Sequence, residues 1–278
     1  MSSLIPGEML AAQVVKVTHP SPSCHIQPVT SYSQFNERYQ IHKIPTPRSL
    51  GPNEILLKTA AASLCHTDLL VTAGKFPTKL PRTASHEGTG IVQAVGSAVK
   101  DFKIGDRVMA GLPKRPCGDC INCKGPENWH QYCQNIEGCI GFLVDGAFAE
   151  YLVADSAFSA KVPDDLSLVS AAPLACAGIT IWGGIVRAAV PKNGWLAIVG
   201  SGGGLGHLGI QMARVKGINV IGIDAPDEGI ALSKEAGCEH VFDARKGKEE
   251  VVREVQALTN GLGVEAAINV SYHEYHAA

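Results

Sequence analysis

The chain contains 278 residues, a length that predicts about two domains at roughly 150 residues each. Hydrophobic residues make up 45% and charged residues 18% of the chain, a composition that excludes disorder as the main state and allows a sizeable buried core. The 24 Lys and Arg residues nearly balance the 26 Asp and Glu residues, so the formal net charge of −2 gives no reason to expect nucleic acid or an anionic membrane surface as a partner.

The cysteine content and the N-terminal sequence favour the cytoplasm over a secreted location. An odd count of nine cysteines in a long chain argues against a disulfide-stapled secreted protein. Residues 1–11 show neither the pattern of a signal peptide nor that of a transit peptide. Residues 166–186 carry no charge, but their Ser, Thr, Gly and Pro content favours a buried pair of helices over a membrane span. We therefore expect a soluble, cytoplasmic protein that does not bind membranes.

The first part of the chain has the pattern of a β-rich domain. Residues 1–50 are rich in Pro, Ser and His, so we expect irregular chain with one or two short strands. Further on, short apolar or alternating runs separated by glycine-bearing turns predict a barrel-like antiparallel domain. The predicted strands are residues 13–17, 54–59, 90–95, 107–110 and 148–153.

After residue 163, strand and helix patterns alternate. Helices are predicted at residues 170–190, 205–216, 227–236 and 246–258, and strands at residues 195–199, 219–223, 240–242 and 264–270. This alternation predicts βαβ units around a parallel sheet. The sequence therefore predicts an α/β protein with two domains, residues 1–165 and residues 166–278.

A glycine-rich turn connects the first strand and the first following helix of the second domain. It comprises Gly200, Ser201, Gly202, Gly203, Gly204, Leu205 and Gly206. Glycines let the backbone approach a pyrophosphate, whose charge the N-terminus of the next helix stabilises. Asp224 closes the second strand about 20 residues later, where a carboxylate accepts hydrogen bonds from ribose hydroxyls and repels a 2′-phosphate. The pattern predicts NAD rather than NADP, and a turn that only permits close packing is the alternative.

A second motif is a run of four cysteines at short spacing, Cys117, Cys120, Cys123 and Cys133. Four thiolates in a reducing compartment suit a closed tetrahedral Zn²⁺ site, which would fix a lobe of about residues 115–135 that has no core of its own. Free buried cysteines or a redox pair are alternatives that two-residue gaps disfavour. A nucleic-acid zinc ribbon is a further alternative, but Lys114 and Arg115 stand against Asp119 and Glu127 and form no basic stripe.

Three further segments carry metal-ligand side chains: residues 65–68 (Cys-His-Thr-Asp), 86–90 (His-Glu-Gly-Thr-Gly) and 174–180 (Leu-Ala-Cys-Ala-Gly-Ile-Thr). Together with the cysteine lobe, the glycine turn, residues 222–224 (Gly-Ile-Asp) and residues 268–271 (Ile-Asn-Val-Ser), they resemble the zinc-dependent medium-chain alcohol dehydrogenases, in particular the fungal branch. The resemblance runs from about residue 13 onward. It implies a GroES-like catalytic domain followed by a Rossmann domain, and two Zn²⁺ ions per chain. It also implies NAD-dependent interconversion of an alcohol and its aldehyde or ketone, by a homodimer or homotetramer.

The resemblance implies roles for individual residues. Cys65, His86 and Cys176 would be the ligands of a catalytic Zn²⁺, which polarises a carbonyl or lowers the pKa of an alcohol. Asp68 would orient His86, and Glu87 would lie beside the metal. Thr67 would bind the substrate oxygen and begin a proton relay, and His66 would meet the pyrophosphate. The other implied cofactor-binding residues are Gly200, Gly202, Gly203, Gly204, Leu205, Gly206, Asp224 and Val270.

Several positions depart from the family pattern. Leu70 stands three residues after Thr67, where the family usually has the relay histidine, and leucine cannot carry a proton. Ser85 stands where a glycine usually precedes the His-Glu pair, and the gap between the last two lobe cysteines is longer than usual. Phe76 and Leu112 stand where fungal ethanol enzymes line the pocket with tryptophan, so we expect room for a bulkier alcohol or aldehyde.

The C-terminus is the largest departure, because the family continues well past Ser271. We therefore expect an incomplete Rossmann domain with an exposed edge strand. Either the chain is a fragment or a truncated gene model, or the product is unstable. Two functions remain open: a zinc- and NAD-dependent alcohol dehydrogenase, and a catalytically inactive relative that only binds zinc and nucleotide. Asp224 disfavours an NADP-dependent reductase of the same family.

Overall fold

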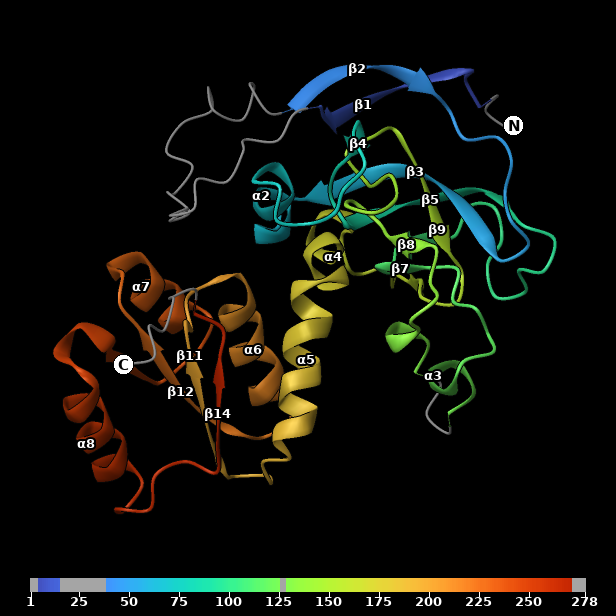
Figure 1. Ribbon diagram of the computed structural model, residues 1–278. Coiled ribbons are helices and arrows are strands. Elements are labelled where there is room, and N and C mark those ends of the chain that lie inside the picture. The colour runs from blue at the N-terminus through green and yellow to red at the C-terminus, as the bar shows by residue number, and fades with distance from the viewer. Residues whose placement is uncertain (1–4, 16–38, 126–128, 272–278) are drawn as a thin grey trace. The chain divides into compact units, whose positions relative to one another are not determined.

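The computed structural model describes residues 5–15, 39–125 and 129–271 (Figure 1). The chain divides into two compact units, Met1–Cys176 and Ala177–Ala278. The first unit extends past the expected boundary near residue 165, because the helical turn that follows is tied to its sheet. The Thr89 hydroxyl donates a hydrogen bond of 2.8 Å to the carbonyl of Leu168, which begins that turn.

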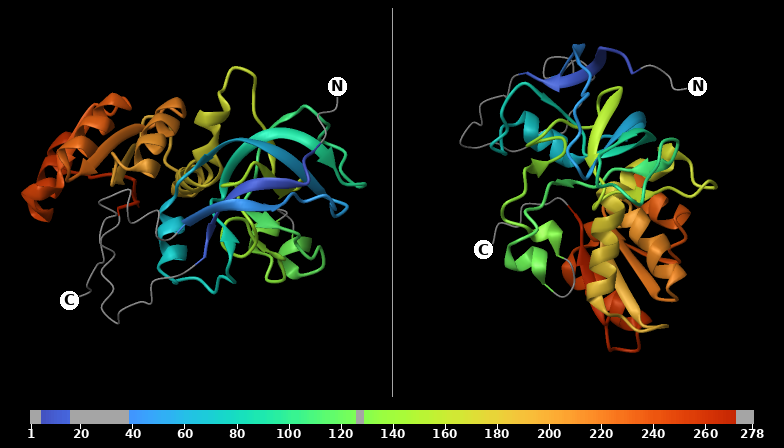
Figure 2. Two further views of the ribbon diagram at one scale, coloured as in Figure 1. Left: turned by 90° about the horizontal axis from the view of Figure 1, so that it is seen from above. Right: turned by 90° about the vertical axis from the view of Figure 1, so that its right-hand side faces the viewer.

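Antiparallel strands build the first unit. A five-stranded sheet has the order β10 (Ala160–Lys161), β6 (Arg107–Met109), β5 (Glu87–Val95), β3 (Glu54–Ser63) and β9 (Tyr151–Asp155). A three-stranded sheet has the order β2 (Tyr39–Pro45), β1 (Glu8–Val14) and β4 (Arg82–Thr83), and Figure 2 shows β1 and β2 side by side. The short strands β7 (Pro113–Lys114) and β8 (Gly138–Cys139) pair with each other. The expected β-rich antiparallel architecture is confirmed.

Strand β3 is buried on both faces at its start. Successive side chains of a strand point to opposite faces, so Ile55 and Leu57 enter one apolar cluster while Leu56 enters another. The first cluster includes Val92, Val108, Ile140 and Leu152, and the second includes Met9 and Tyr151. Because both faces are covered, the run from Ile55 to Leu57 is apolar without alternation.

The helices of the first unit are short: α2 (His66–Thr72), α3 (Ile121–Lys124), η1 (His130–Tyr132), α4 (Leu168–Ala171) and η2 (Ala172–Ala175). The prediction of one helix over residues 170–190 is wrong. Pro173 lies in the first turn of η2, and Cys176 leaves the helical region with φ −125° and ψ −68°. The helix resumes as α5 (Ala177–Ala188). The break places the Cys176 side chain at the end of η2 instead of on a continuous helix face.

No single helix among the described residues is long and apolar enough to cross a bilayer. The helical segments Leu168–Ala175 and Ala177–Ala188 pass that test only as a bent pair, by length and composition.

The first predicted strand also differs from the structure. Strand β1 begins at Glu8 rather than at residue 13 and pairs along its whole length with β2. Residues 16 and 17 of the prediction lie outside the described residues. The alternating burial of β1 is governed by long-range pairing with β2 and β4, which local periodicity does not show.

The second unit contains a parallel sheet with the order β13 (His240–Asp243), β12 (Asn219–Asp224), β11 (Trp195–Val199) and β14 (Ala266–Asn269). The other helices of this unit are α6 (Gly204–Val215), α7 (Asp227–Glu235), η3 (Ala244–Lys246) and α8 (Lys248–Leu258). This order, with neighbours 3-2-1-4, is the first half of a doubly wound sheet with a further strand. The predicted strand–helix alternation is therefore confirmed, and β14 ends the sheet within the described part of the chain.

Helices cover both faces of this parallel sheet (Figure 1). On one face, Ile181 of α5 and Ile210 of α6 pack with Leu196 and Ile198 of β11. On the other face, Val251 and Val255 of α8 pack with Ala197 and Ile221. The strands are buried from both sides, which explains why they are short continuous apolar runs.

Candidate active site and metal sites

Four potential metal ligands of the first unit meet at one point. The ligand atoms of Cys65, His86, Glu87 and Cys176 all lie within 4.8 Å of one another. Cys65 precedes α2, His86 immediately precedes β5, Glu87 begins β5, and Cys176 follows η2. His86 is 2% and Glu87 3% exposed. The structure thus brings together the three dispersed segments that carry the sequence-predicted residues.

This donor set fits a Zn²⁺ ion. Zinc–thiolate bonds of about 2.3 Å in a tetrahedron separate two sulfurs by about 3.8 Å, and the Sγ atoms of Cys65 and Cys176 are 4.0 Å apart. The Nδ1 atom of His86 is buried and has no hydrogen-bond partner among the described residues. One ring nitrogen of His86 lies within 4.8 Å of both sulfurs, so two sulfurs and a ring nitrogen would hold a bound cation.

The thiols of Cys65 and Cys176 differ in acidity. The hydrogen bond from Cys176 lowers the pKa of Cys65 to about 3, and the same contact with the Cys65 sulfur raises the pKa of Cys176. Burial alone would lower the pKa of His86, but the hydrogen bond with Cys65 and its negative charge outweigh burial and raise that pKa. The cluster therefore concentrates negative charge that a cation would neutralise.

Asp68 fixes the backbone on both sides of this cluster. Its Oδ2 atom accepts a hydrogen bond of 2.8 Å from the N–H of Cys65, and its Oδ1 atom accepts one of 2.9 Å from the N–H of Ser85. Burial raises the pKa of Asp68. Instead of the expected direct contact with the His86 ring, both oxygens hold the segments that carry the ligands. Asp68 thus acts on the position of Cys65 and His86 through the main chain.

Helix α2 carries the other residues expected to take part in catalysis. The Oγ1 atom of Thr67 lies 3.8 Å from the Sγ atom of Cys65, so the hydroxyl lies beside the cluster. His66 is exposed at the first residue of the helix. Leu70 is half-buried on the next turn, and its carbonyl accepts a hydrogen bond from the N–H of Lys75. The structure therefore places the Thr67 hydroxyl beside a cluster residue.

An aromatic residue that the sequence does not mark lies against the His86 ring. Phe142 packs edge-on to His86 with 6.2 Å between ring centroids, and Phe76 packs against Phe142 at 5.0 Å. The carbonyl of Leu112 accepts a hydrogen bond from the N–H of Ile140. A link to the cluster is thus observed for Phe76, and the pocket role of Leu112 stays a prediction. No local motif identifies Phe142, because only the loop fold after β8 brings it to His86.

The four lobe cysteines form a second group of potential metal ligands. Their sulfurs lie within 4.8 Å of one another. The separations are 3.5 Å from Cys133 to Cys117, 3.6 Å from Cys120 to Cys123, 3.8 Å from Cys120 to Cys133 and 4.0 Å from Cys117 to Cys123. These sulfur–sulfur separations lie close to the value of about 3.8 Å expected for a tetrahedral zinc–thiolate site. Backbone N–H groups of Asp119 and Cys120 lower the pKa of Cys117 to about 6, which favours its thiolate.

Ion pairs attach this lobe to the five-stranded sheet. Glu54, 2% exposed at the start of β3, accepts from Lys114 at 3.1 Å and from Arg115 at 2.9 Å. The N–H of Gly51 donates to the same carboxylate at 2.6 Å. Arg115 also pairs with Glu137 at 3.1 Å. The positive charges of Lys114 and Arg115, at the N-terminal end of the lobe, are therefore neutralised within the first unit.

The glycine turn of the second unit lies where β11 and β12 end. Gly200 has a φ of +82°, a region that favours glycine. A Cβ atom on Gly202 would lie 2.0 Å from the carbonyl oxygen of Gly229 in α7, so only glycine permits this approach. Asp224 at the end of β12 accepts a hydrogen bond from the N–H of Gly202 at 2.6 Å. The turn and the acidic residue are thus in direct contact.

The remaining predicted cofactor-binding residues surround this turn. Gly203 precedes the first turn of α6, which contains Gly204, Leu205 and Gly206. Val270 follows β14, and its N–H donates to the carbonyl of Val199 at 2.9 Å. Strands β12 and β14 lie on opposite sides of β11. Doubly wound sheets bind their ligands at such a switch point, beyond the carboxyl ends of the strands.

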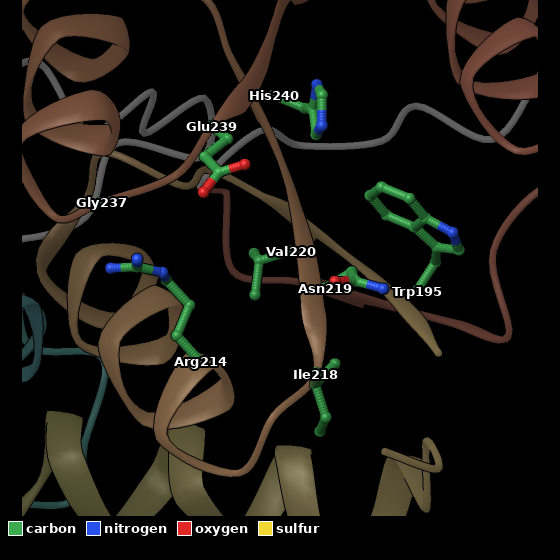
Figure 3. A pocket seen from close by; sticks show the side chains of 8 residues that line it. All are labelled: Trp195, Arg214, Ile218, Asn219, Val220, Gly237, Glu239 and His240. Carbon is green, nitrogen blue, oxygen red and sulfur yellow. The ribbon is translucent and has the colours of Figure 1, made fainter. Parts of the chain in front are cut away.

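A separate pocket of about 90 Å³ lies at the amino ends of the strands of this sheet (Figure 3). The Trp195 and His240 rings there are 5.6 Å apart. Its lining residues are Trp195, Arg214, Ile218, Asn219, Val220, Gly237, Glu239 and His240. None of the sequence-predicted site residues contributes to it.

Comparisons with known proteins agree with this geometry. The family model for the alcohol dehydrogenase GroES-like domain matches residues 51–164. The family model for zinc-binding dehydrogenases matches residues 204–276. Alcohol dehydrogenase 1 of Emericella nidulans is 37% identical over 234 residues, which cover 84% of this chain and 66% of that protein. An alcohol dehydrogenase of Geobacillus stearothermophilus is 37% identical over 247 residues, with coverages of 87% and 69%.

A solved structure shows the same architecture. The alcohol dehydrogenase of the archaeon Aeropyrum pernix superimposes with a TM-score of 0.76 at 31% identity, over 94% of this chain and 71% of that one. The chain spans about two thirds of the length of the curated relatives it matches. It belongs to the zinc-dependent medium-chain alcohol dehydrogenase family. The expected fold class, a GroES-like domain followed by a Rossmann domain, is confirmed.

Proposed function

We propose that this chain acts as a zinc- and NAD-dependent alcohol dehydrogenase, which interconverts a primary or secondary alcohol and its aldehyde or ketone. The observation that carries the proposal is the meeting of Cys65, His86 and Cys176, from three distant segments, at one point. Relatives that are alcohol dehydrogenases by name support the assignment of the reaction.

Residues of the first unit would bind the metal and the substrate. Cys65, His86 and Cys176 would hold a Zn²⁺ ion, and three protein ligands leave one position open to a small molecule. When bound, the ion supplies Lewis acidity, which polarises a carbonyl or makes an alcohol more acidic. The Thr67 hydroxyl, beside Cys65, would exchange a hydrogen bond and a proton with the substrate oxygen. Phe142 would give the site an apolar wall that limits the access of water.

Residues of the second unit would bind the cofactor. The N–H groups of Gly203, Gly204 and Leu205 precede or begin α6, and the positive end of a helix dipole favours a pyrophosphate there. Asp224 has acceptor capacity left for ribose hydroxyls, because each of its oxygens accepts one backbone hydrogen bond and keeps a further lone pair. Its negative charge favours NAD over NADP. Val270 would lie beside the bound nucleotide.

The lobe would bind a second Zn²⁺ ion with a structural role. Four protein ligands close the coordination sphere, so no position remains for a substrate. Cys117, Cys120, Cys123 and Cys133 would therefore stabilise the fold of the lobe without taking part in turnover.

A turnover assay tests the proposed function. The zinc-loaded chain is mixed with NADH and a panel of aldehydes and ketones, and the loss of NADH absorbance is followed. We expect turnover that Cys65→Ser abolishes while NADH binding persists. Two zinc ions per chain and bound NADH without turnover of any substrate would instead support the inactive relative that only binds zinc and nucleotide.

The proposal extends to assembly and location. We expect a homodimer or homotetramer, as is typical of the family, and light scattering of the purified chain measures its mass. We expect a cytoplasmic location, because thiolate metal ligands stay reduced there. The partner is a small-molecule alcohol or aldehyde, and the near-neutral charge gives no support for a nucleic-acid or membrane partner.

A further inference from the structure

Ser63 and Glu87 face each other across the sheet of the first unit. Ser63 ends β3 and Glu87 begins β5, and the antiparallel register pairs these two residues directly. Side chains of directly opposed residues lie on the same face of a sheet. The Ser63 hydroxyl donates a hydrogen bond to the Oε2 atom of Glu87. Since Glu87 is 3% exposed, water cannot readily replace this donor.

Ser85 connects the same two residues through a second route. Its hydroxyl donates to the carbonyl of Ser63 at 2.9 Å and accepts from the N–H of Glu87 at 3.3 Å. Ser85 is fully buried and has a φ of +67°, a conformation that glycine adopts with less strain. Glycine at this position would supply neither hydrogen bond. Ser85 therefore links the end of β3 to the start of β5, next to His86.

The Glu87 carboxylate lies close enough to the other ligand atoms to compete for a metal position. One of its oxygens is within 4.8 Å of the ligand atoms of Cys65, His86 and Cys176. Carboxylate oxygens bind Zn²⁺ at about 2.0–2.2 Å, so a Glu87 oxygen that moved into the fourth coordination position would become a fourth protein ligand. That change would occupy the position that the proposed reaction requires for the substrate.

We infer that Ser63 is a positioning residue, which holds the Glu87 carboxylate beside the three ligands and keeps it out of the fourth coordination position. This inference rests on the proposed function, because it requires a metal ion held by Cys65, His86 and Cys176. Ser63 acts through Glu87 and does not itself touch the metal or the substrate.

The test uses Co²⁺ in place of Zn²⁺, because the visible absorption of Co²⁺ reports its coordination number. The metal-free chain is loaded with Co²⁺, and spectra of Ser63→Ala, Ser63→Thr, Glu87→Gln and the Ser63→Ala/Glu87→Gln double variant are compared with the parent. Difference spectra cancel the contribution of the cysteine lobe. Ser233→Ala, which removes a buried hydroxyl in the second unit, controls for the loss of a hydroxyl elsewhere.

We expect Ser63→Ala to change the Co²⁺ spectrum toward a higher coordination number and to lower kcat/KM about tenfold, within the range of about 10–100-fold for residues that orient metal ligands. Ser63→Thr should restore the parent spectrum, and the Ser63→Ala/Glu87→Gln double variant should match Glu87→Gln. An unchanged spectrum in Ser63→Ala overturns the inference, as does a shift that persists in the Glu87→Gln background. Uptake of one Co²⁺ per chain, unaffected by Cys65→Ser, overturns the catalytic metal site itself and thus the proposed function.

Discussion

The Asp224 carboxylate accepts a hydrogen bond from the backbone N–H of Gly202, with 2.6 Å between Oδ2 and the nitrogen. The other oxygen accepts from the N–H of Ala225 at 2.8 Å. A Cβ atom on Gly229 would lie 2.9 Å from the same carboxylate, so α7 passes close over it. The charge that selects the cofactor in our proposal is therefore held in one orientation against the glycine turn.

Removal of this charge should change cofactor preference. We expect Asp224→Asn, which retains an oxygen acceptor for the Gly202 N–H, to bind NADH about tenfold more weakly, a loss of roughly 1.4 kcal/mol. The same variant should bind NADPH more tightly than the parent, because repulsion of the 2′-phosphate is relieved. Fluorescence titration measures both dissociation constants. Equal affinities of the parent chain for NADH and NADPH would show that Asp224 does not contact the ribose.

Loss of one lobe cysteine should destabilise the fold more than it changes the chemistry. Cys120→Ser removes one of four sulfurs from a closed site, so we expect one Zn²⁺ per chain fewer, a lower melting temperature and a lower yield. Elemental analysis and thermal unfolding check this. Cys139→Ser, outside both clusters, is the matched control. Unchanged zinc content and melting temperature in Cys120→Ser would contradict the structural metal site.

Because of the Glu54 ion pairs, the free energy of unfolding should decrease at acidic pH. Burial alone would raise the pKa of Glu54, but the Gly51 N–H, Lys114 and Arg115 together lower it below its ordinary value of 4.5. A carboxyl whose pKa is lower in the folded state stabilises the fold above its unfolded pKa. That contribution is lost as pH falls below about 4.5 and through the lower folded pKa.

We therefore expect Glu54→Gln to lower the free energy of unfolding by about 1 to 3 kcal/mol at pH 7. The loss stays below that of a fully buried pair because the Arg115 side chain is 50% exposed. The difference between parent and variant should shrink on acidification below pH 4.5. Urea unfolding at pH 7 and pH 4 measures it, and a constant difference would contradict the role assigned to the Glu54 charge.

Leu70 should limit proton release in alcohol oxidation. In the proposed reaction a proton would pass through Thr67, and with no histidine at this position water would have to accept it, although water is less effective than a positioned base. We expect Leu70→His to increase the rate of oxidation most near pH 7, without a change in zinc content. Leu70→Gln, which is polar but cannot act as a base at this pH, is the control. An unchanged pH profile and solvent isotope effect would show that packing of Leu70, hydride transfer or product release governs the rate.

The sequence by itself determined the elements whose signal is local. The parallel sheet follows from alternating strand and helix periods, and the contact between Asp224 and the glycine turn follows from a strand–turn–helix of standard spacing. The four lobe cysteines come together over a short stretch of chain, so their spacing alone predicts their meeting. In each case the partners are near neighbours in sequence or on adjacent strands of a regular motif.

Only the tertiary structure decided the features that depend on long-range pairing. Cys65, His86 and Cys176 have no common spacing, so their meeting followed from family resemblance and not from any local rule. The pairing of Ser63 with Glu87 depends on the register of β3 and β5, and the contact of Phe142 with His86 depends on a loop path. A shift of one residue in a strand moves every side chain to the other face. Hydrophobic pattern and propensity define the faces of a strand, but the partner across the sheet is selected by the packing of the whole unit.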